Sequence, residues 1–210
     1  MTKYSNNDHY TDPQTGVLKN LLGITTEDEL EKAEATFAGI RSYELAQNPI
    51  KGSFDLEHMK AIHGYMFKDL YEWAGECRDI DISKGDNFFA HHNHIEAAAK
   101  SIFDKLAKEK HLDGLSKTDF CERAAFYLGE INALHPFREG NGRVQREFIS
   151  YLAYANGYYI EWKNIDQDEM IEASIASFKH GDCSKFAAYL RANIKDMSKD
   201  DGAGEQILRR

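Results

Sequence analysis

Cysteine and proline are both scarce in this chain, with three of each among 210 residues. The cysteines are odd in number, far apart and without a CxxC pair: Cys77, Cys121 and Cys183. This pattern argues against a disulfide framework and predicts reduced thiols in a cytoplasmic protein. So few prolines leave long stretches free of helix breakers, and a mostly helical protein is expected.

Long apolar runs and an excess of positive charge are missing as well. No apolar stretch approaches the roughly 20 residues that a helix needs to cross a bilayer, and residues 1–20 lack the apolar region of a signal peptide. The formal net charge is −9, whereas a broad nucleic-acid surface requires a basic face. The sequence therefore predicts neither a membrane nor a nucleic acid as a partner.

What is present is the pattern of helices around one core. Polar N-cap residues stand before apolar residues spaced three or four positions apart at Thr26, Asp55, Ser116, Asp166 and Ser184. Gly75 is expected to end the second of these helices. The predicted fold class is therefore all-α.

Residues 77–90 break this pattern. Isoleucines alternate with aspartates and a run of turn residues follows, which predicts a short β-hairpin inserted among the helices. One domain over residues 1–196 is expected. Residues 197–210 are polar and unpatterned, so we expect a disordered tail or a linker to a further region.

The most informative segment is HPFREGNGRVQR, residues 135–146. His135 lies between a predicted helix and a proline, so its imidazole is expected on a loop, where it can accept a proton near neutral pH. Phe137 alternates away from it and is interpreted as an anchor in the core. A carboxylate beside a phosphate site is repulsive unless a metal lies between them, so Glu139 implies Mg²⁺.

Glycines and arginines complete the segment. Backbone amides at the glycines can point inward at a helix N-terminus and favour an anion. Arg143 and Arg146 are three residues apart and share a helix face, where two guanidinium groups can hold successive phosphates. The predicted nucleotide-binding residues are Gly140, Asn141, Gly142, Arg143, Arg146 and Arg138. Together these features predict displacement at phosphorus, although each feature alone is more often structural.

The segment matches His-x-Phe-x-[Asp/Glu]-Gly-Asn-Gly-Arg-x-x-Arg at every fixed position, so the chain resembles the Fic family. The resemblance extends to residues 10–20, 71–75 and 81–85. Within the family, the chain resembles class I Fic toxins of the VbhT type and the Fic domains of type IV-secreted Bep effectors. It implies the Fic fold, a helical bundle with a β-hairpin flap beside the active-site loop.

The resemblance also implies an activity, the transfer of AMP from ATP to a Ser, Thr or Tyr hydroxyl of a target protein with release of pyrophosphate. By position, His135 would be the base that deprotonates the hydroxyl, and Glu139 would bind Mg²⁺. Asn141 would orient the α-phosphate. Arg143 would hold the α- and β-phosphates, and Arg146 would hold the γ-phosphate.

Substrate docking and regulation are implied in the same way. The flap would pair its backbone with an extended segment of the target. Its expected docking residues are Ser83, Lys84, Gly85, Asp86 and Asn87. Family members are often silenced by a Glu, in the pattern [Ser/Thr]-x-x-x-Glu-[Gly/Asn], that pairs with the last motif arginine. The only Glu followed by Gly or Asn here is Glu139 in the motif, so a separate small antitoxin is expected to supply that Glu to Arg146.

The expected location is the bacterial cytoplasm, or a recipient or host cell reached by type IV secretion. Other interpretations stay open. The same fold could transfer UMP, phosphocholine or phosphate, because phosphate-binding residues do not identify the rest of the donor. The domain could also bind a nucleotide without catalysis. A metal site built from His91, His92 and His94, together with His58, His63 or His180, is a further alternative, although the spacing matches no zinc pattern.

Overall fold

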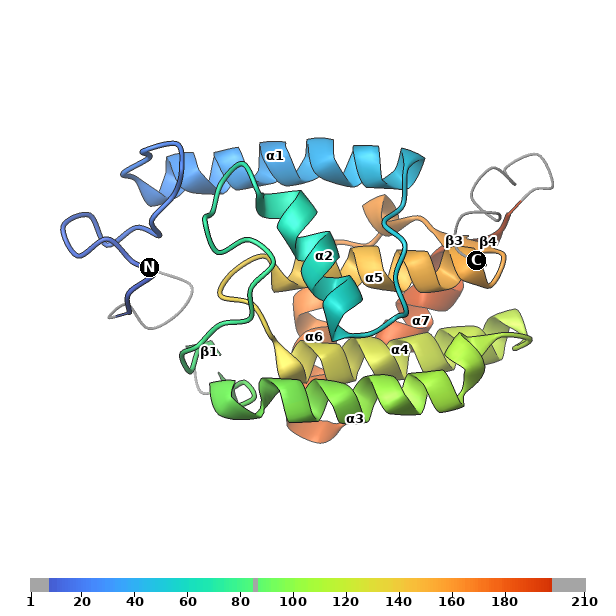
Figure 1. The fold of residues 1–210 in the computed structure, drawn as a ribbon. Helices are drawn as coiled ribbons and strands as arrows, with labels where there is room; N and C mark the ends of the chain where they lie inside the picture. The colour runs from blue at the N-terminus through green and yellow to red at the C-terminus, as the bar shows by residue number, and fades with distance from the viewer. Residues whose placement is uncertain (1–7, 85–86, 198–210) are drawn as a thin grey trace.

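Two helices, α4 (Lys117–Leu134) and α5 (Asn141–Ala155), form the centre of a helical bundle (Figure 1). This computed structural model describes residues 8–84 and 87–197. The other α-helices of the described chain are α1 (Glu27–Gln47), α2 (Leu56–Phe67), α3 (Ile95–Lys108), α6 (Gln167–His180) and α7 (Ser184–Asn193). The expected tail lies, apart from Met197, outside the described residues.

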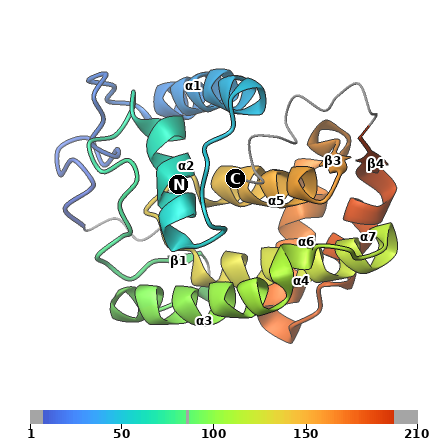
Figure 2. The same ribbon diagram turned by 45° about the vertical axis from the view of Figure 1, so that its right-hand side comes forward.

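The central pair is surrounded because its side chains are apolar in most directions. Helix α4 packs against α3, α5, α6 and α7, and α5 also packs against α2. A second view shows α5 between α1 and α4 (Figure 2). Four large side chains of the pair are fully buried: Phe120, Tyr127, Phe148 and Tyr151. Burying one such side chain stabilises the folded state by roughly 1.5–3 kcal/mol. The loop that joins α4 and α5 is therefore held between two firmly packed helices. None of the described helices is both long and apolar enough to cross a membrane.

Local sequence signals mark the helix starts to within one residue, since Ser184 is the first residue of α7 and Cys183 is its N-cap. Asp55 and Ser116 each accept the backbone N–H of the residue three positions on, which caps α2 and α4. Helix α6 begins with a capping box formed by Asp166 and Glu169. Thr26 precedes α1 as expected, but its hydroxyl donates to the Glu29 carboxylate instead of capping the backbone.

The structure differs from the sequence-based expectation at two places. Helix α2 ends at Phe67 and not at Gly75, because the chain then turns to bury Tyr71 in the core. A second small sheet is also present, in which β3 (Tyr158–Ile160) pairs antiparallel with β4 (Ile194–Asp196). These strands are far apart in sequence, so no local pattern marks their pairing.

The predicted hairpin forms, but it is shorter than residues 77–90. Strands β1 (Ser83–Lys84) and β2 (Asn87–Phe88) pair antiparallel, with the first residue of β1 opposite the last of β2. Gly85 and Asp86, expected at its tip, lie outside the described residues. Short 3-10 helices connect larger elements at His92–His94, Lys110–Leu112 and Trp162–Asn164. The predicted all-α class is confirmed, with strands confined to these small ladders.

Candidate active site

The motif forms the loop between α4 and α5. His135 ends α4 in a left-handed conformation, with φ 45°, and its N–H donates to the carbonyl of Ile131. Pro136 follows, and the ring and missing N–H of a proline prevent the helix from continuing. Gly140 precedes α5 with φ 80°, and a Cβ there would lie 2.4 Å from the ring of Phe67. Only glycine fits this position.

Asn141 and Phe137 hold the loop in a closed turn. The side-chain oxygen of Asn141 accepts the Phe137 N–H at 2.9 Å, and its nitrogen donates to the Phe137 carbonyl at 2.7 Å. Phe137 is fully buried, and its ring stacks on that of His63 with centroids 4.0 Å apart. Asn141, to which the resemblance assigned an α-phosphate contact, therefore shapes the loop with both polar ends of its side chain.

His63 on α2 supports the same loop. Gly75 donates its N–H to Nδ1 of His63 at 2.8 Å, so the proton of the neutral ring lies on Nε2. Nε2 is 3.1 Å from the carbonyl oxygen of Glu139, to which it donates. Burial lowers the pKa of His63 to about 3, so the ring stays neutral and keeps this arrangement. A histidine within a helix gives no sequence signal for such a role.

Arg78 joins the loop to the hairpin. Its buried guanidinium donates to carbonyl oxygens of the loop and of both hairpin limbs: His135 at 2.9 Å, Ile80 at 2.6 Å and Ala90. Its backbone N–H donates to the carbonyl of Pro136 at 2.9 Å. Because Ile80 precedes β1 and Ala90 follows β2, one side chain connects both limbs to the loop. No sequence pattern marks Arg78, since only the folded structure shows that it is buried.

His135 presents a neutral imidazole to a cavity. The residue is 8% exposed, and its ring stacks on Phe89 with centroids 3.8 Å apart. Nδ1 lies 3.2 Å from the carbonyl oxygen of Asn132, which can only accept, so the proton of the neutral ring lies on Nδ1 and Nε2 is the basic atom. Burial lowers the pKa of His135 to about 4. The ring can therefore accept a proton at neutral pH.

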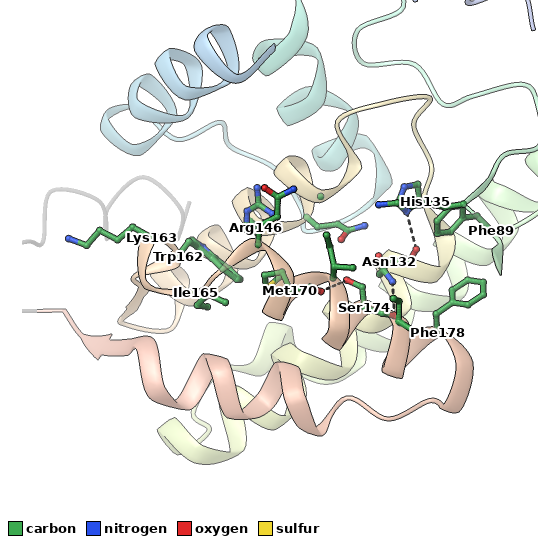
Figure 3. Close-up of a pocket in the computed structure, with 16 residues that line it drawn as sticks. Phe89, Asn132, His135, Arg146, Trp162, Lys163, Ile165, Met170, Ser174 and Phe178 are labelled. Carbon is green, nitrogen blue, oxygen red and sulfur yellow. Dashed lines mark hydrogen bonds between the residues drawn. The ribbon is translucent and has the colours of Figure 1, made fainter. Parts of the chain in front are cut away.

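The cavity has a volume of about 580 Å³ and lies between the loop, the hairpin and α6. His135 and Phe89 lie at one end and Trp162 at the other, with Arg146 between them (Figure 3). Helix α6 contributes a largely apolar wall: Met170, Ile171, Ser174, Ile175 and Phe178. Cavities of roughly 300–1,000 Å³ suit small-molecule ligands, so this one can hold a nucleotide.

Arg146 brings positive charge into the cavity. Burial and the neighbouring charge of Arg143 lower the pKa of its guanidinium, and Glu147 offsets part of this effect. Within residues 8–84 and 87–197, no carboxylate lies at ion-pair distance from it. A partly buried cation without such a partner is unfavourable, so an anionic ligand is stabilised here.

Arg143 does not line this cavity, contrary to the expectation that both guanidinium groups share one phosphate site. Its Nη2 is 2.6 Å from Oε2 of Glu34 on α1 and 3.5 Å from Oε1 of Glu139. The guanidinium also lies over the ring of Phe67, 4.9 Å from its centroid. Glu34 is 5% exposed and accepts a further hydrogen bond from the Tyr71 hydroxyl. This buried carboxylate, which no sequence pattern indicated, determines where Arg143 points.

Glu139 and Arg138 are both buried, with different neighbours. Oε1 of Glu139 accepts the Gly140 N–H at 2.9 Å, so the carboxylate lies at the N-terminus of α5. Its oxygens are the ligand type that Mg²⁺ prefers, and Mg²⁺ is usually bound by one or two carboxylates plus substrate phosphates. Arg138 is 4% exposed and pairs with Asp8 at 2.9 Å. Neither Arg138, which pairs with Asp8, nor Glu139 is among the residues that line the cavity.

The chain has clear relatives among known proteins. The model of the Fic/DOC family matches residues 53–153. The chain is 38% identical to the probable protein adenylyltransferase y4lH of Sinorhizobium fredii, over 87% of this chain and 93% of that one. The chain belongs to the Fic/DOC family. It is also 50% identical to the protein adenylyltransferase VbhT of Bartonella schoenbuchensis over 99% of its own length, and it spans 45% of that relative.

Solved Fic structures share the fold. BepC of Bartonella tribocorum, solved with bound AMPPNP, has a TM-score of 0.84 and 25% identity, covering 90% of this chain and 97% of that chain. An N-terminal Fic domain from Bartonella quintana, solved with bound ADP, also has a TM-score of 0.84, with 28% identity and coverage of 91% and 96%. The predicted Fic fold, a helical bundle with a short hairpin, is thereby confirmed.

In this Fic domain the hairpin lies where a flap is expected. Lys84 is exposed on β1 and lines the cavity, whereas Ser83 is half-buried. Asn87 begins β2, opposite Lys84 in the ladder. The next turn of chain brings Phe89 onto the His135 ring. The hairpin therefore borders the imidazole directly.

Proposed function

We propose that this Fic domain is a protein adenylyltransferase. It moves AMP from ATP to a Ser, Thr or Tyr hydroxyl of a target protein and releases pyrophosphate. The supporting observation is that the neutral imidazole of His135 and the guanidinium of Arg146 face the same cavity. VbhT is named a protein adenylyltransferase, and BepC was solved with AMPPNP bound.

The chain's own groups account for the transfer. Nε2 of His135 removes the proton of the target hydroxyl while the hydroxyl oxygen attacks the α-phosphorus of ATP. A bond forms between that oxygen and phosphorus, the bond from phosphorus to the bridging oxygen breaks, and pyrophosphate leaves with the electron pair. Backbone N–H groups at the start of α5, where Gly142 lines the cavity, stabilise the negative charge. Arg146 holds the terminal phosphate.

Glu139 would hold Mg²⁺ together with phosphate oxygens of ATP. When bound, the ion would supply positive charge that favours the departure of pyrophosphate. Arg143 does not line the cavity, but it adjoins Glu139 at 3.5 Å, so its positive charge would act on this carboxylate. Glu139 and Arg143 are both at the N-terminal end of α5, where the helix dipole also favours an anion.

The cavity favours a nucleotide as the donor. Met170, Ile171 and Ile175 of α6 form an apolar surface that suits a planar base. A donor that carries no base would leave this surface uncovered, so such a donor fits the cavity less well. UMP transfer is the second candidate, because the same surface accepts a pyrimidine. Intact-mass spectrometry of the modified target separates these donors by the mass that each adds.

The target protein is proposed to dock on the hairpin. In the described chain, β1 and β2 pair only with each other, so each keeps an outer edge for an extended target segment. Backbone pairing at that edge would place the target's side chain near Lys84 and His135, both of which line the cavity. Such docking selects a hydroxyl by position and reads little of the surrounding sequence.

Inhibition by a separate small antitoxin is part of the proposal. A glutamate from that partner would pair with Arg146 and exclude the γ-phosphate. The domain would then act as a toxin in the bacterial cytoplasm, or as an effector moved by type IV secretion. BepC, which shares the fold, is a VirB-translocated effector.

A labelling experiment tests the activity. The purified chain is incubated with α-labelled ATP and bacterial or eukaryotic lysate, beside His135→Ala and His180→Gln, a change at an exposed histidine at the end of α6. We expect a labelled protein that requires His135 and is unaffected by His180→Gln. Equal labelling by His135→Ala would refute the proposal. Label transferred only from γ-labelled ATP would identify phosphate transfer instead.

A further inference from the structure

We propose a metal site, separate from Glu139, at the base of the hairpin. Its ligands are Asp81, His91 and His92, and it would take a divalent transition-metal ion of the Zn²⁺ type. One ligand atom of each residue lies within 4.8 Å of those of the other two. The site is distinct from the proposed catalytic residues and does not depend on the proposed activity.

The distances suit a tetrahedral ion. Nε2 of His91 is 3.2 Å from Oδ2 of Asp81, and Nδ1 of His92 is 2.9 Å from Oδ1 of Asp81. Bonds of about 2.0 Å in a tetrahedron place neighbouring ligand atoms roughly 3.3 Å apart. These two distances end on different oxygens of Asp81, so with one oxygen as the ligand one edge is near this length, and every edge is no longer than 4.8 Å. Both imidazoles are partly exposed, so small side-chain rotations can shorten the longer edges.

Backbone contacts orient the ligands in advance. The Asn93 N–H lies 3.3 Å from Nδ1 of His91, which leaves Nε2 of that ring facing Asp81. The His92 N–H donates to Oδ1 of Asp81 at 2.8 Å and holds the carboxylate in place. Ordering these groups on binding therefore costs less than it would for free side chains.

The ligand set determines which ion is favoured. Imidazole nitrogens suit Zn²⁺, Ni²⁺ and Cu²⁺, whereas Mg²⁺ prefers oxygen ligands alone. With only three protein ligands, water would occupy the fourth position of a tetrahedral ion. The guanidinium of Arg78 lies 4.0 Å from Oδ1 of Asp81, and its positive charge opposes a dication. A site of modest affinity is therefore expected.

A bound ion would connect the two limbs of the hairpin. Asp81 precedes β1, while His91 and His92 follow β2. Phe89, whose ring covers that of His135, lies within the segment that the ion would close. The histidine spacing alone could not indicate this site, because the third ligand is on the opposite limb.

Isothermal titration of tag-free protein with zinc chloride tests the site. We expect one ion per chain in the wild type, with binding roughly tenfold or more weaker in Asp81→Asn and in His92→Gln. His180→Gln is the matched control at an exposed histidine outside the cluster, and its affinity should equal that of the wild type. Wild-type zinc binding by Asp81→Asn and His92→Gln would overturn the proposal.

Amide hydrogen exchange gives a second readout. Exchange in residues 81–84 and 87–92 should slow when Zn²⁺ is added to the wild type, and should stay unchanged in His92→Gln. Circular dichroism establishes that both proteins are folded at the same temperature. If saturating Zn²⁺ leaves wild-type exchange in this segment unchanged, the ion binds elsewhere and the site proposed here does not exist.

Discussion

One imidazole, that of His135, performs the proposed proton transfer, and its surroundings determine when it can act. Burial lowers its pKa to about 4, and the Asn132 carbonyl selects the tautomer with a basic Nε2. The motif predicted His135 as the base because its neighbours in sequence are diagnostic. The motif could not predict the pKa, because the burial depends partly on Phe89, which is distant in sequence.

The pH dependence of the reaction follows from this pKa. The imidazole loses its proton as pH rises through about 4, so kcat/KM should rise there and stay level up to neutral pH. Initial rates of target adenylylation across this range measure it. A midpoint near ~6.5, the ordinary value for histidine, would show that the ring is not buried during catalysis.

His135→Ala should lower kcat by roughly 10²–10⁴-fold.

Glu34→Gln should destabilise the fold, because it leaves the guanidinium of Arg143 without its nearest carboxylate. Neutralising one partner of a buried ion pair costs about 3–5 kcal/mol. Arg143 is 21% exposed, so the lower end, about 3 kcal/mol, is expected. Urea unfolding measures the change, with Glu31→Gln at an exposed position of α1 as the control. Equal stability of the two variants would contradict the assignment.

At the scale of elements, the join between α4 and α5 shows what local sequence can and cannot specify. Pro136 and the glycines predicted where one helix ends and the next begins, since their backbone preferences are local. The end of α2 and the pairing of β3 with β4 were not predictable, because both depend on packing between distant segments. Gly140 combines the two kinds of constraint, a positive φ and a close approach to Phe67.

Gly140→Ala should separate these two constraints when it is compared with Gly114→Ala. Gly114 has φ 76° with nothing within 4 Å of a Cβ, so its substitution tests backbone strain alone, about 1–2 kcal/mol. Gly140→Ala adds a collision with Phe67, for which overpacking costs typically about 1–3 kcal/mol more. Thermal or urea unfolding measures both. Similar losses in the two variants would mean that Phe67 moves aside.

At the scale of the whole molecule, the site depends on contacts that bring distant segments together. The motif predicted the family and the Fic fold, because both follow from consecutive residues, and the assignment of His135 as the base stays a prediction. The motif could not predict that Glu34 holds Arg143 or that His63 and Arg78 hold the loop, because their partners lie on other elements. Separation in sequence also explains the wrong prediction for Arg138: its partner Asp8 is far away in the chain, so the motif alone predicts a nucleotide contact.

Acid should destabilise the native state through its buried histidines. His63 and His135 have pKa values lowered to about 3 and about 4. In the unfolded chain such groups titrate near ~6.5, so below that pH the unfolded state binds protons that the native state does not. Stability is therefore complete above pH ~6.5 and falls as pH drops toward the native values. At about pH 5 each histidine accounts for a loss on the order of 2 kcal/mol.

Urea unfolding at about pH 7 and pH 5 measures this loss, and His63→Gln isolates one contribution. The variant should be less stable at both pH values, since the ring packs between Phe137 and Trp73. The difference between the two pH values should shrink by about 2 kcal/mol, because one protonation event is removed. Titration of the carboxylates changes the stability of the wild type and of the variant equally, so it cancels in the comparison. An undiminished difference would show that His63 titrates normally in the native state.

The bonds of Arg78 to both hairpin limbs and to the His135 carbonyl have a mechanical consequence. Any tilt imposed on the hairpin by an incoming polypeptide is transmitted through one rigid planar group to the backbone of the base. A badly seated polypeptide would then shift the imidazole along with it. Discrimination between partners would therefore be seen in turnover more than in affinity.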